Sequence, residues 1–227
     1  MTTTNTPRRQ QAGPPLGVLA LVSTGLLLAG LVTSAALGGT FPSPYADPAV
    51  IAAHFATRPD AVLAGGVLLF GSSVPLAIYA ATASARLRQL GVTAPGATIG
   101  LVGGVLASGA LAASGLLTWT LARPAVREAG PLVRALADLT FLTGGPAHVV
   151  FLGLLVAGIA VPALLLGLLP RGVAVAGLVI AAVAELSFLS LAVPALSLLI
   201  PLARFPGLVW LVVAGFLLPN QHPRRSR

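Results

Sequence analysis

Six long stretches of apolar residues, separated by short polar or proline-rich segments, follow one another along the chain. About 20 consecutive apolar residues cross the hydrocarbon core of a bilayer as a helix, and each stretch is long enough. We therefore expect an all-α integral membrane protein whose six transmembrane helices form a bundle. The expected spans are residues 16–37, 61–84, 96–120, 146–169, 172–194 and 198–219.

The first stretch also has features of a secretory signal peptide. Arg8 and Arg9 precede it, and the small residues Ser34-Ala35-Ala36 near its end resemble a cleavage site. The apolar part of a signal peptide is about 7–15 residues long, however, and this stretch is longer. A retained first transmembrane helix is the preferred interpretation.

The boundary between the last two spans falls within one long apolar stretch. From Gly172 to Ala203 the chain carries a single charged residue, Glu185, over 32 residues. This is too long for one span, and together with the apolar run after Phe205 it accommodates two. The depths of Glu185 and Arg204 in the membrane depend on where the chain turns between them.

Short helices and polar tails are expected outside the spans. Asp47 followed by Pro48 is a typical helix start, with a capping side chain and a proline in the first turn, so residues 49–57 should form a surface helix. A second surface helix is expected over residues 131–138. Residues 1–15 and 220–227 should be cytoplasmic tails, the first of them disordered.

Composition agrees with a membrane protein. Apolar residues make up 56% of the 227 positions and charged residues only 8%, with a mean hydropathy of +0.97. Soluble domains carry about 25% charged residues, so this chain has too little polar surface to be one. The net charge of +8 does not indicate nucleic-acid binding, because the basic residues are scattered between apolar runs.

The arginines instead predict the orientation, because positive charge collects on cytoplasmic loops. With both termini in the cytoplasm, the cytoplasmic segments hold eight arginines and no acidic residue, and the other side holds five arginines and four acids. This favours a multi-pass protein of the cell membrane. The eight are Arg8, Arg9, Arg86, Arg88, Arg171, Arg224, Arg225 and Arg227.

The sequence lacks the residues that several kinds of chemistry require. The chain has no cysteine and no lysine, which excludes disulfides, thiolate ligands and Schiff bases. Two histidines within the body of the chain, without a carboxylate three or four positions away, make a poor metal site. No phosphate-binding, metalloprotease or serine-hydrolase motif is present, so we expect no metal and no cofactor.

Small residues recur at every fourth position of the third span, at Gly96, Gly100 and Gly104. Such a ridge lets two helix backbones approach closely in lipid. Packing inside the bundle is the preferred interpretation, and the alternative is that this face binds a second copy of the chain or another membrane protein.

Glu185 is the only acidic residue within an expected span. A charged side chain in the bilayer usually faces a partner or a cavity. Because the fifth and sixth helices run antiparallel, Arg204 lies at a similar expected depth, and we predict an ion pair between Glu185 and Arg204. The alternatives are a protonated Glu185 bonded locally, with Arg204 reaching outward, or a ligand- or proton-handling role.

Four further polar residues are candidate ligand contacts. His148 is expected near the membrane interface, in the first turn of the fourth span. Ser72, Ser73 and Ser108 fall at middle depth and could line a polar pocket, although serine is also an ordinary helix-packing residue.

Several segments resemble an uncharacterised family of bacterial multi-pass membrane proteins, of the domain-of-unknown-function class. They are Ala46-Asp47-Pro48-Ala49-Val50, residues 61–90 with Val74-Pro75 and Arg86-Leu87-Arg88, and Thr143-Gly144-Gly145-Pro146. The resemblance covers residues 15–200 and rests on helix order and loose motifs. It implies the same membrane architecture and assigns no activity or catalytic residue.

The expected function is non-enzymatic. The protein would bind a small apolar ligand or membrane lipid, or serve as a membrane component of a regulatory or transport assembly. One alternative is an intramembrane enzyme that uses Glu185 as acid and base on an apolar substrate. Another is a small secondary transporter.

Overall fold

The computed structural model describes residues 13–38, 41–127 and 129–219, which contain helices and no β-strand. Residues 1–12 of the first expected tail (1–15) and all of the second (220–227) lie outside the described residues. Six helical segments are long and apolar enough to cross a membrane, which confirms the all-α, six-span architecture. They are Leu16–Ala36, Pro59–Gln89, Gly96–Leu121, Gly130–Leu166, Arg171–Leu191 and Pro194–Leu217.

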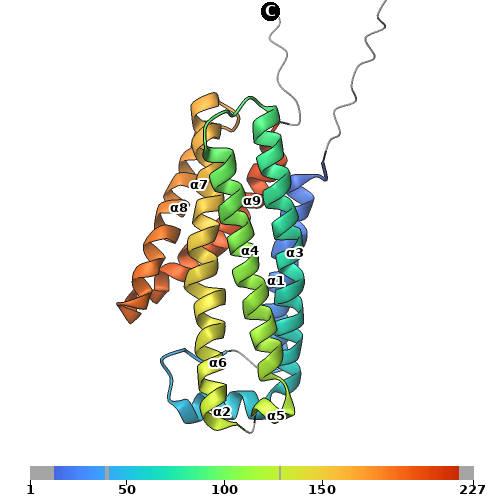
Figure 1. Cartoon of the computed structure of the whole chain (residues 1–227), viewed down its shortest axis with the longest axis vertical. Coiled ribbons are helices and arrows are strands. Elements are labelled where there is room, and N and C mark those ends of the chain that lie inside the picture. Colours follow the sequence, from blue (N-terminus) through green and yellow to red (C-terminus); the bar gives the residue numbers. More distant parts are fainter. Residues whose placement is uncertain (1–12, 39–40, 128, 220–227) are drawn as a thin grey trace, which may run out of the picture.

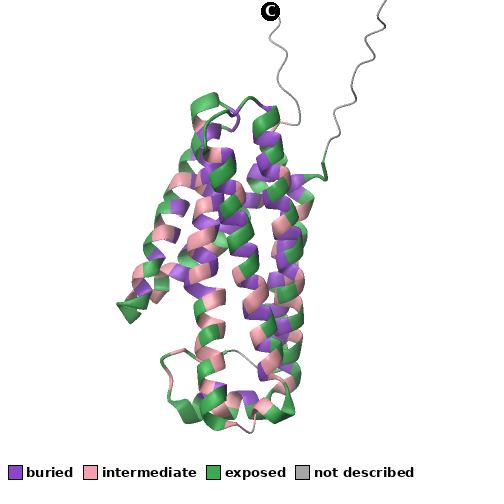
Figure 2. Cartoon of the chain, in the orientation of Figure 1, coloured by how far each residue is buried: buried purple, intermediate pink, exposed green. Residues whose placement is uncertain are grey.

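The spans form a closed ring. α1 (Leu16–Ala36), α3 (Pro59–Gln89), α4 (Gly96–Leu121), α7 (His148–Leu166), α8 (Arg171–Leu186) and α9 (Leu199–Leu217) each pack on the next, and α9 returns to α1 (Figure 1). Buried residues follow the inward faces of α3, α4 and α7 (Figure 2). The Tyr79 hydroxyl in this core donates a hydrogen bond of 3.1 Å to the Leu211 carbonyl, joining α3 to α9.

Both described ends of the chain lie at the same end of the bundle, called the terminal end below (Figure 1). Arg86, Arg88 and Arg171 lie at this end too, at the finish of α3 and the start of α8. The opposite end, called the cap end, carries α2 (Pro48–Thr57), α5 (Pro124–Arg127) and α6 (Gly130–Leu142).

The cap end has its own small core. In α2 the Asp47 side chain accepts a hydrogen bond of 2.8 Å from the Ala49 N–H, and Pro48 occupies the first turn. This is the helix start expected from the sequence. The helix turns its buried face toward α6 and the ends of α3 and α4. The buried residues are Ile51, Phe55, Val62, Leu121 and Val133.

The segment 131–138 is helical but is not the separate surface helix that was expected. α6 continues through a π-helical turn, η1 (Thr143–Ala147), into α7, so that Gly130–Leu166 is one rod of 37 residues. At 1.5 Å per residue the rod is about 55 Å long, well beyond the ~30 Å hydrocarbon core. Pro146 marks the π turn instead of a helix start, because a π turn accommodates a residue that cannot complete the α-helical hydrogen-bond pattern.

The chain turns between the last two spans at Ala192–Val193. α8 ends in the 3₁₀ segment η2 (Ser187–Leu191), and Pro194 opens the second 3₁₀ segment, η3 (Pro194–Leu198), which leads into α9. This turn stops partway along the bundle, short of α2 and α6 (Figure 1). Most of its residues are exposed (Figure 2). The cap end therefore extends beyond the α8–α9 hairpin.

Candidate functional site

A cavity of about 270 Å³ lies between α1, α3, α4, η1 and α9, and reaches into the cap end. Its wall is mostly aliphatic and aromatic, and it draws on segments that are far apart in the sequence. Leu27 and Leu31 come from α1, Leu69 from α3, and Ile200 from α9. The remaining large apolar residues are Phe41, Ile51, Phe55 and Phe141.

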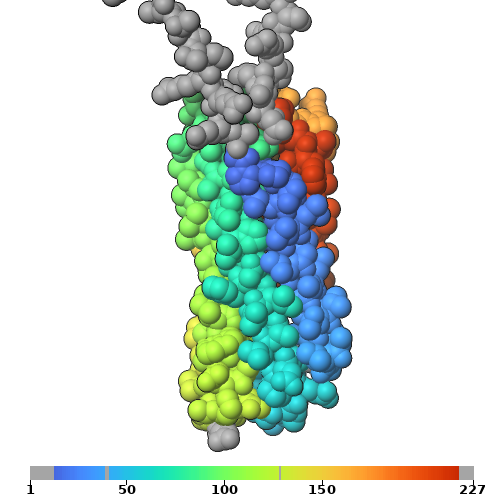
Figure 3. Space-filling model, turned by 90° about the vertical axis from the view of Figure 1, so that its right-hand side faces the viewer, coloured from blue at the N-terminus to red at the C-terminus, as the bar shows by residue number. Residues whose placement is uncertain are grey.

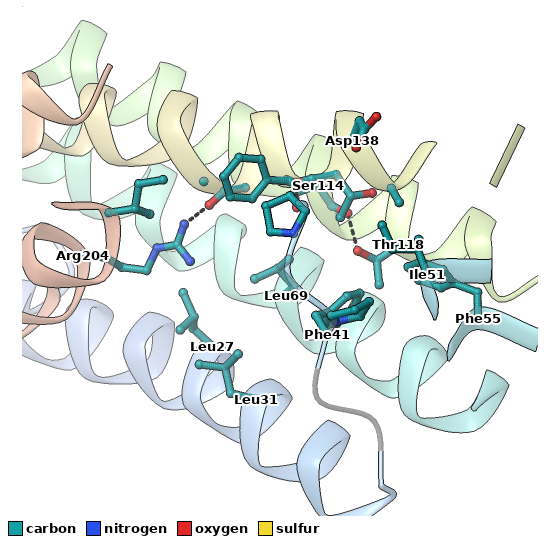
Figure 4. Close-up of a pocket in the computed structure, with 18 residues that line it drawn as sticks. Leu27, Leu31, Phe41, Ile51, Phe55, Leu69, Ser114, Thr118, Asp138 and Arg204 are labelled. Carbon is teal, nitrogen blue, oxygen red and sulfur yellow. Dashed lines mark hydrogen bonds between the residues drawn. The ribbon is translucent and has the colours of Figure 1, made fainter. Parts of the chain in front are cut away.

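Among the described residues that line this cavity, Arg204 is the only one with a cationic side chain. It extends from α9 into one end of the cavity, opposite Phe41 and Phe55 (Figure 4). Its Nη2 donates a hydrogen bond to the carbonyl of Gly144 in the π turn. Its Nε is buried and has no hydrogen-bond partner among the described residues.

Gly144 permits this contact because the π turn lies directly against α4. A β-carbon placed at Gly144 would come within 2.9 Å of the Ser114 Cβ, closer than side chains tolerate. The Ser114 hydroxyl also donates a hydrogen bond of 3.0 Å to the Thr140 carbonyl, which ties α4 to the end of α6. The local sequence Thr143-Gly144-Gly145-Pro146 thus supplies both the π turn and the room for it.

The other polar groups of the wall are already bonded. The Thr118 hydroxyl donates to the Ser114 carbonyl at 2.8 Å, and the Thr140 hydroxyl donates to the Leu136 carbonyl at 2.8 Å. Asp138 accepts a hydrogen bond of 3.0 Å from Arg134 Nε. Among the described residues of this wall, Arg204 is therefore the side chain that keeps N–H donors without a partner.

Arg134 also holds the segment that covers the cavity. Its Nη1 donates to the Ala46 carbonyl at 3.2 Å and its Nη2 donates to the Pro44 carbonyl at 3.0 Å. Phe41 of the same segment packs on His54 and Phe55 of α2, with ring centroids 5.6 and 6.0 Å away. One arginine of α6 thereby fixes the proline-rich connection between α1 and α2.

The depth of Arg204 follows from its contact with the long rod. Leu166, at the terminal end of α7, lies 22 residues beyond Gly144. At 1.5 Å per residue this is about 33 Å, close to the ~30 Å thickness of the hydrocarbon core. A hydrocarbon core that begins at Leu166 would therefore end near the guanidinium group, with the phenylalanine-lined part of the cavity beyond it.

The predicted Glu185–Arg204 ion pair is wrong. Glu185 Oε1 lies against α7, where a β-carbon placed at Gly153 would be 3.0 Å from it. Gly153 is nine residues, or about 13 Å, from the Gly144 that Arg204 contacts. Over the described ranges the one ion pair is Arg134–Asp138. Depth counting matched the two side chains but could not give the rotation of α8 and α9 about their axes.

Glu185 does not line the cavity, and its buried Oε1 has no hydrogen-bond partner among the residues described. His148 does not line the cavity either. It is fully buried between α7 and α4, and its Nδ1 donates a hydrogen bond of 3.0 Å to the Ala107 carbonyl. A carbonyl can only accept, so Nδ1 carries the proton, and Nε2 is left without a partner in the described structure.

Of the three candidate serines, Ser108 joins two helices, and the hydroxyls of Ser72 and Ser73 bond within α3. The Ser108 hydroxyl of α4 donates to the Ser73 carbonyl of α3 at 2.6 Å. The Ser73 hydroxyl donates to the Phe70 carbonyl at 2.6 Å, and the Ser72 hydroxyl to the Leu69 carbonyl at 2.9 Å. None of the three lines the cavity.

The glycines of α4 pack inside the bundle. A β-carbon at Gly96 would lie 3.2 Å from the Gly158 carbonyl oxygen of α7, and one at Gly100 would lie 3.5 Å from the Gly158 Cα. Gly104 faces Leu155 of α7 and Ala80 of α3. The ridge is occupied by neighbouring helices of the same chain.

The sequence did not single out the aromatic residues of the cavity. Phe41 lies in a proline-rich connection and Phe55 in a short surface helix, where apolar residues stand out little in so apolar a chain. The excess of large aromatic residues in a segment expected to face water was the available signal. In the part of the chain described, no three histidine, aspartate or glutamate residues gather as a metal site would require.

Comparisons with protein-family models, with curated proteins and with solved structures give no match for this chain. The function is therefore argued from the geometry of the cavity.

Proposed function

We propose that this protein binds a small lipid-like ligand in the cavity between α1 and α9, without catalysing a reaction. The observation that carries the proposal is the cavity itself, with a wall of apolar side chains and one polar anchor, Arg204. Ligand sites are typically concave and mostly apolar, with a few placed polar groups, and span about 300–1,000 Å³. At about 270 Å³ this cavity is near the small end of that range.

The proposed location is the cell membrane, with the terminal end in the cytoplasm. The support is the arginine distribution, because Arg86, Arg88 and Arg171 all lie at the terminal end with the two chain ends. In this orientation the cap end faces away from the cytoplasm, and the cavity receives its ligand at the level of the outer leaflet. A bacterial source, suggested by the family resemblance, is part of the same proposal.

An intramembrane enzyme that uses Glu185 has less support. Catalysis would need a substrate site at that carboxyl group, and the residues that line the cavity do not include it. A protein that binds this ligand as one component of a larger membrane assembly would use the same cavity, so the proposal covers that role as well.

The test is native mass spectrometry of the full chain, purified in a mild nonionic detergent, followed by lipid extraction. We expect a one-to-one adduct on the wild-type protein. Ala137 lines the cavity, so Ala137→Phe should fill it and abolish the adduct. The control Ala182→Phe adds the same ring at an exposed position on α8 and should keep it. Wild-type protein that carries no adduct and acquires none from added lipid would refute the proposal, as would an adduct unaffected by Ala137→Phe.

A further inference from the structure

Arg204 has a positive charge without a counter-ion in the described structure. Arginine stays ionised in proteins, and a charged group at membrane depth normally pairs with an opposite charge. The Arg204 side chain donates one hydrogen bond, to the Gly144 carbonyl, and its buried Nε has no partner in the described structure. A carbonyl is a dipole, which satisfies one N–H and leaves the charge uncompensated.

Neither nearby acidic side chain provides the counter-ion. Asp138 lines the same cavity but is bonded to Arg134 at 3.0 Å, four residues earlier on α6. Glu185 lies against Gly153 of α7, about 13 Å along the rod from the Arg204 contact. The positive charge therefore lies at the cavity without an anionic partner, and Nη2 is the one guanidinium nitrogen that is bonded within the described structure.

The cavity has its cationic group at one end, and the rest of its wall is mostly apolar, with polar side chains that are already bonded. The guanidinium group occupies one end, Leu27, Leu31 and Leu69 lie beside it, and Phe41 and Phe55 close the other end (Figure 4). A molecule that complements this wall has an anionic head and an apolar body.

The size of the cavity suits an apolar body of one chain. A volume of about 270 Å³ equals that of roughly nine water molecules in the liquid. One short alkyl chain fills this space.

The helices α1 and α9 are in contact near the terminal end and border the cavity farther along. At the terminal end α1 and α9 are in backbone contact, since a β-carbon at Gly215 would lie 2.9 Å from the Gly17 Cα. Farther along, Leu31 of α1 and Arg204 of α9 lie on the cavity instead. Figure 3 shows α9 beside α1 in the half of the bundle nearer the terminal end.

From these observations we infer that the ligand is a single-chain amphiphile whose anionic head, a carboxylate or a phosphate, binds the Arg204 guanidinium. This inference rests on the proposed function and specifies the ligand class. The planar guanidinium donates two parallel N–H bonds to either head group. The chain of the ligand lies along Leu27, Leu31 and Leu69 toward Phe41 and Phe55.

The experiment compares ligands that differ only in the head. The full chain in nonionic detergent is titrated with decanoate, decanol and decyl phosphate at pH 8, and bound fractions are measured by native mass spectrometry. We expect decanoate or decyl phosphate to bind at least about tenfold more tightly than decanol, because charge-assisted bonds are stronger than neutral ones. The tighter of the two anions identifies the head group.

Arg204→Gln should reduce anion binding to the level of decanol and leave decanol unchanged. Arg123→Gln is the matched control, because it removes the same charge from an exposed position at the cap end. Arg204→Lys should retain part of the preference and serves if the glutamine variant fails to fold. The wild type should lose its preference for decanoate over decanol near pH 4, where decanoate is protonated. Arg204→Gln, which should have no such preference, should show no such change.

Two results separate the failure of this inference from that of the proposed function. Equal binding of anions and decanol to the wild type, or a preference that survives in Arg204→Gln, overturns the anionic head and leaves an apolar ligand in place. Absence of binding by all three probes overturns the proposed function as well.

Discussion

Arg204 of α9 and Gly144 of the π turn are joined by a hydrogen bond from the guanidinium Nη2 to the glycine carbonyl. The bond connects α9, the last transmembrane helix, to the π turn where the long rod passes from α6 into α7. It holds the guanidinium group at the end of the cavity, where it points toward the apolar wall (Figure 4).

Gly144→Ala should destabilise the fold and disturb this bond. The added methyl group would lie 2.9 Å from the Ser114 Cβ, so either α4 or the π turn must shift. Overpacking of this kind costs about 1–3 kcal/mol, which thermal unfolding in detergent would measure. Gly109→Ala is the control, because nothing lies within 4 Å of its β-carbon and alanine favours the helix. Equal unfolding temperatures for the two variants would contradict the close contact.

Glu185→Gln and Arg204→Gln should act independently on stability. Their contact points on the rod are about 13 Å apart, and mutations more than 7–10 Å apart usually add to within about 0.3–0.5 kcal/mol. A double-mutant cycle from chemical or thermal unfolding tests this. A coupling free energy above about 1 kcal/mol would contradict this expectation and indicate that the two side chains form an ion pair.

Arg134→Gln should loosen the segment that covers the cavity. The substitution removes the bonds to the Pro44 and Ala46 carbonyls and to Asp138. Amide hydrogen exchange over residues 41–46 should then become faster, at least tenfold at Ala46, whose N–H is bonded to the Ser43 carbonyl at 2.9 Å. Arg123→Gln removes an arginine that lies over the Trp119 ring, 5.0 Å from its centroid, and should leave this exchange unchanged. Unaltered exchange in Arg134→Gln would show that other contacts hold the segment.

Stability should fall in mild acid because of His54. Burial, with the positive charge of Arg58 as the smaller cause, lowers the pKa of His54 below its ordinary value of 6.5. A group whose folded-state pKa is lowered binds its proton more readily in the unfolded chain. The protein should therefore keep its full stability above pH 6.5 and lose some as the pH falls through and below that value.

Thermal unfolding at pH 7.5 and pH 5.5 measures this effect. His54→Gln removes the titrating group, so the difference between the two pH values should shrink in the variant. An identical pH dependence in the wild type and in His54→Gln would assign the acid sensitivity to other groups.

The six spans could be predicted because each is a long apolar run, and hydrocarbon leaves the backbone few structures other than a helix. The surroundings of individual side chains could not. Pro146 reads as a helix start, yet the π turn carries the helix through it, and the predicted surface helix becomes part of the fourth span. Arg204 and Glu185 were paired because their expected depths in the membrane agree. The tilt of α8 and α9, and the rotation of each helix about its axis, decide which neighbours the two side chains contact.

The cavity depends on contacts that no local pattern encodes. Arg134 bonds the connection at Pro44 and Ala46, and Phe41 of this connection packs on His54 and Phe55 of α2. The glycines of α4 were identifiable from their spacing, but whether they met α7 or a second copy of the chain was decided by tertiary packing at Gly158.

Photo-crosslinking with a decanoate analogue that carries a diazirine on its chain tests most directly whether the ligand binds in the cavity. Peptide mapping should place the cross-links on Leu27–Leu31 of α1 and on the segment from Phe41 to Phe55, and Ala137→Phe should suppress them. Cross-links spread over exposed apolar residues outside the cavity, such as Leu165 and Phe216, and unchanged by Ala137→Phe would contradict ligand binding in the cavity.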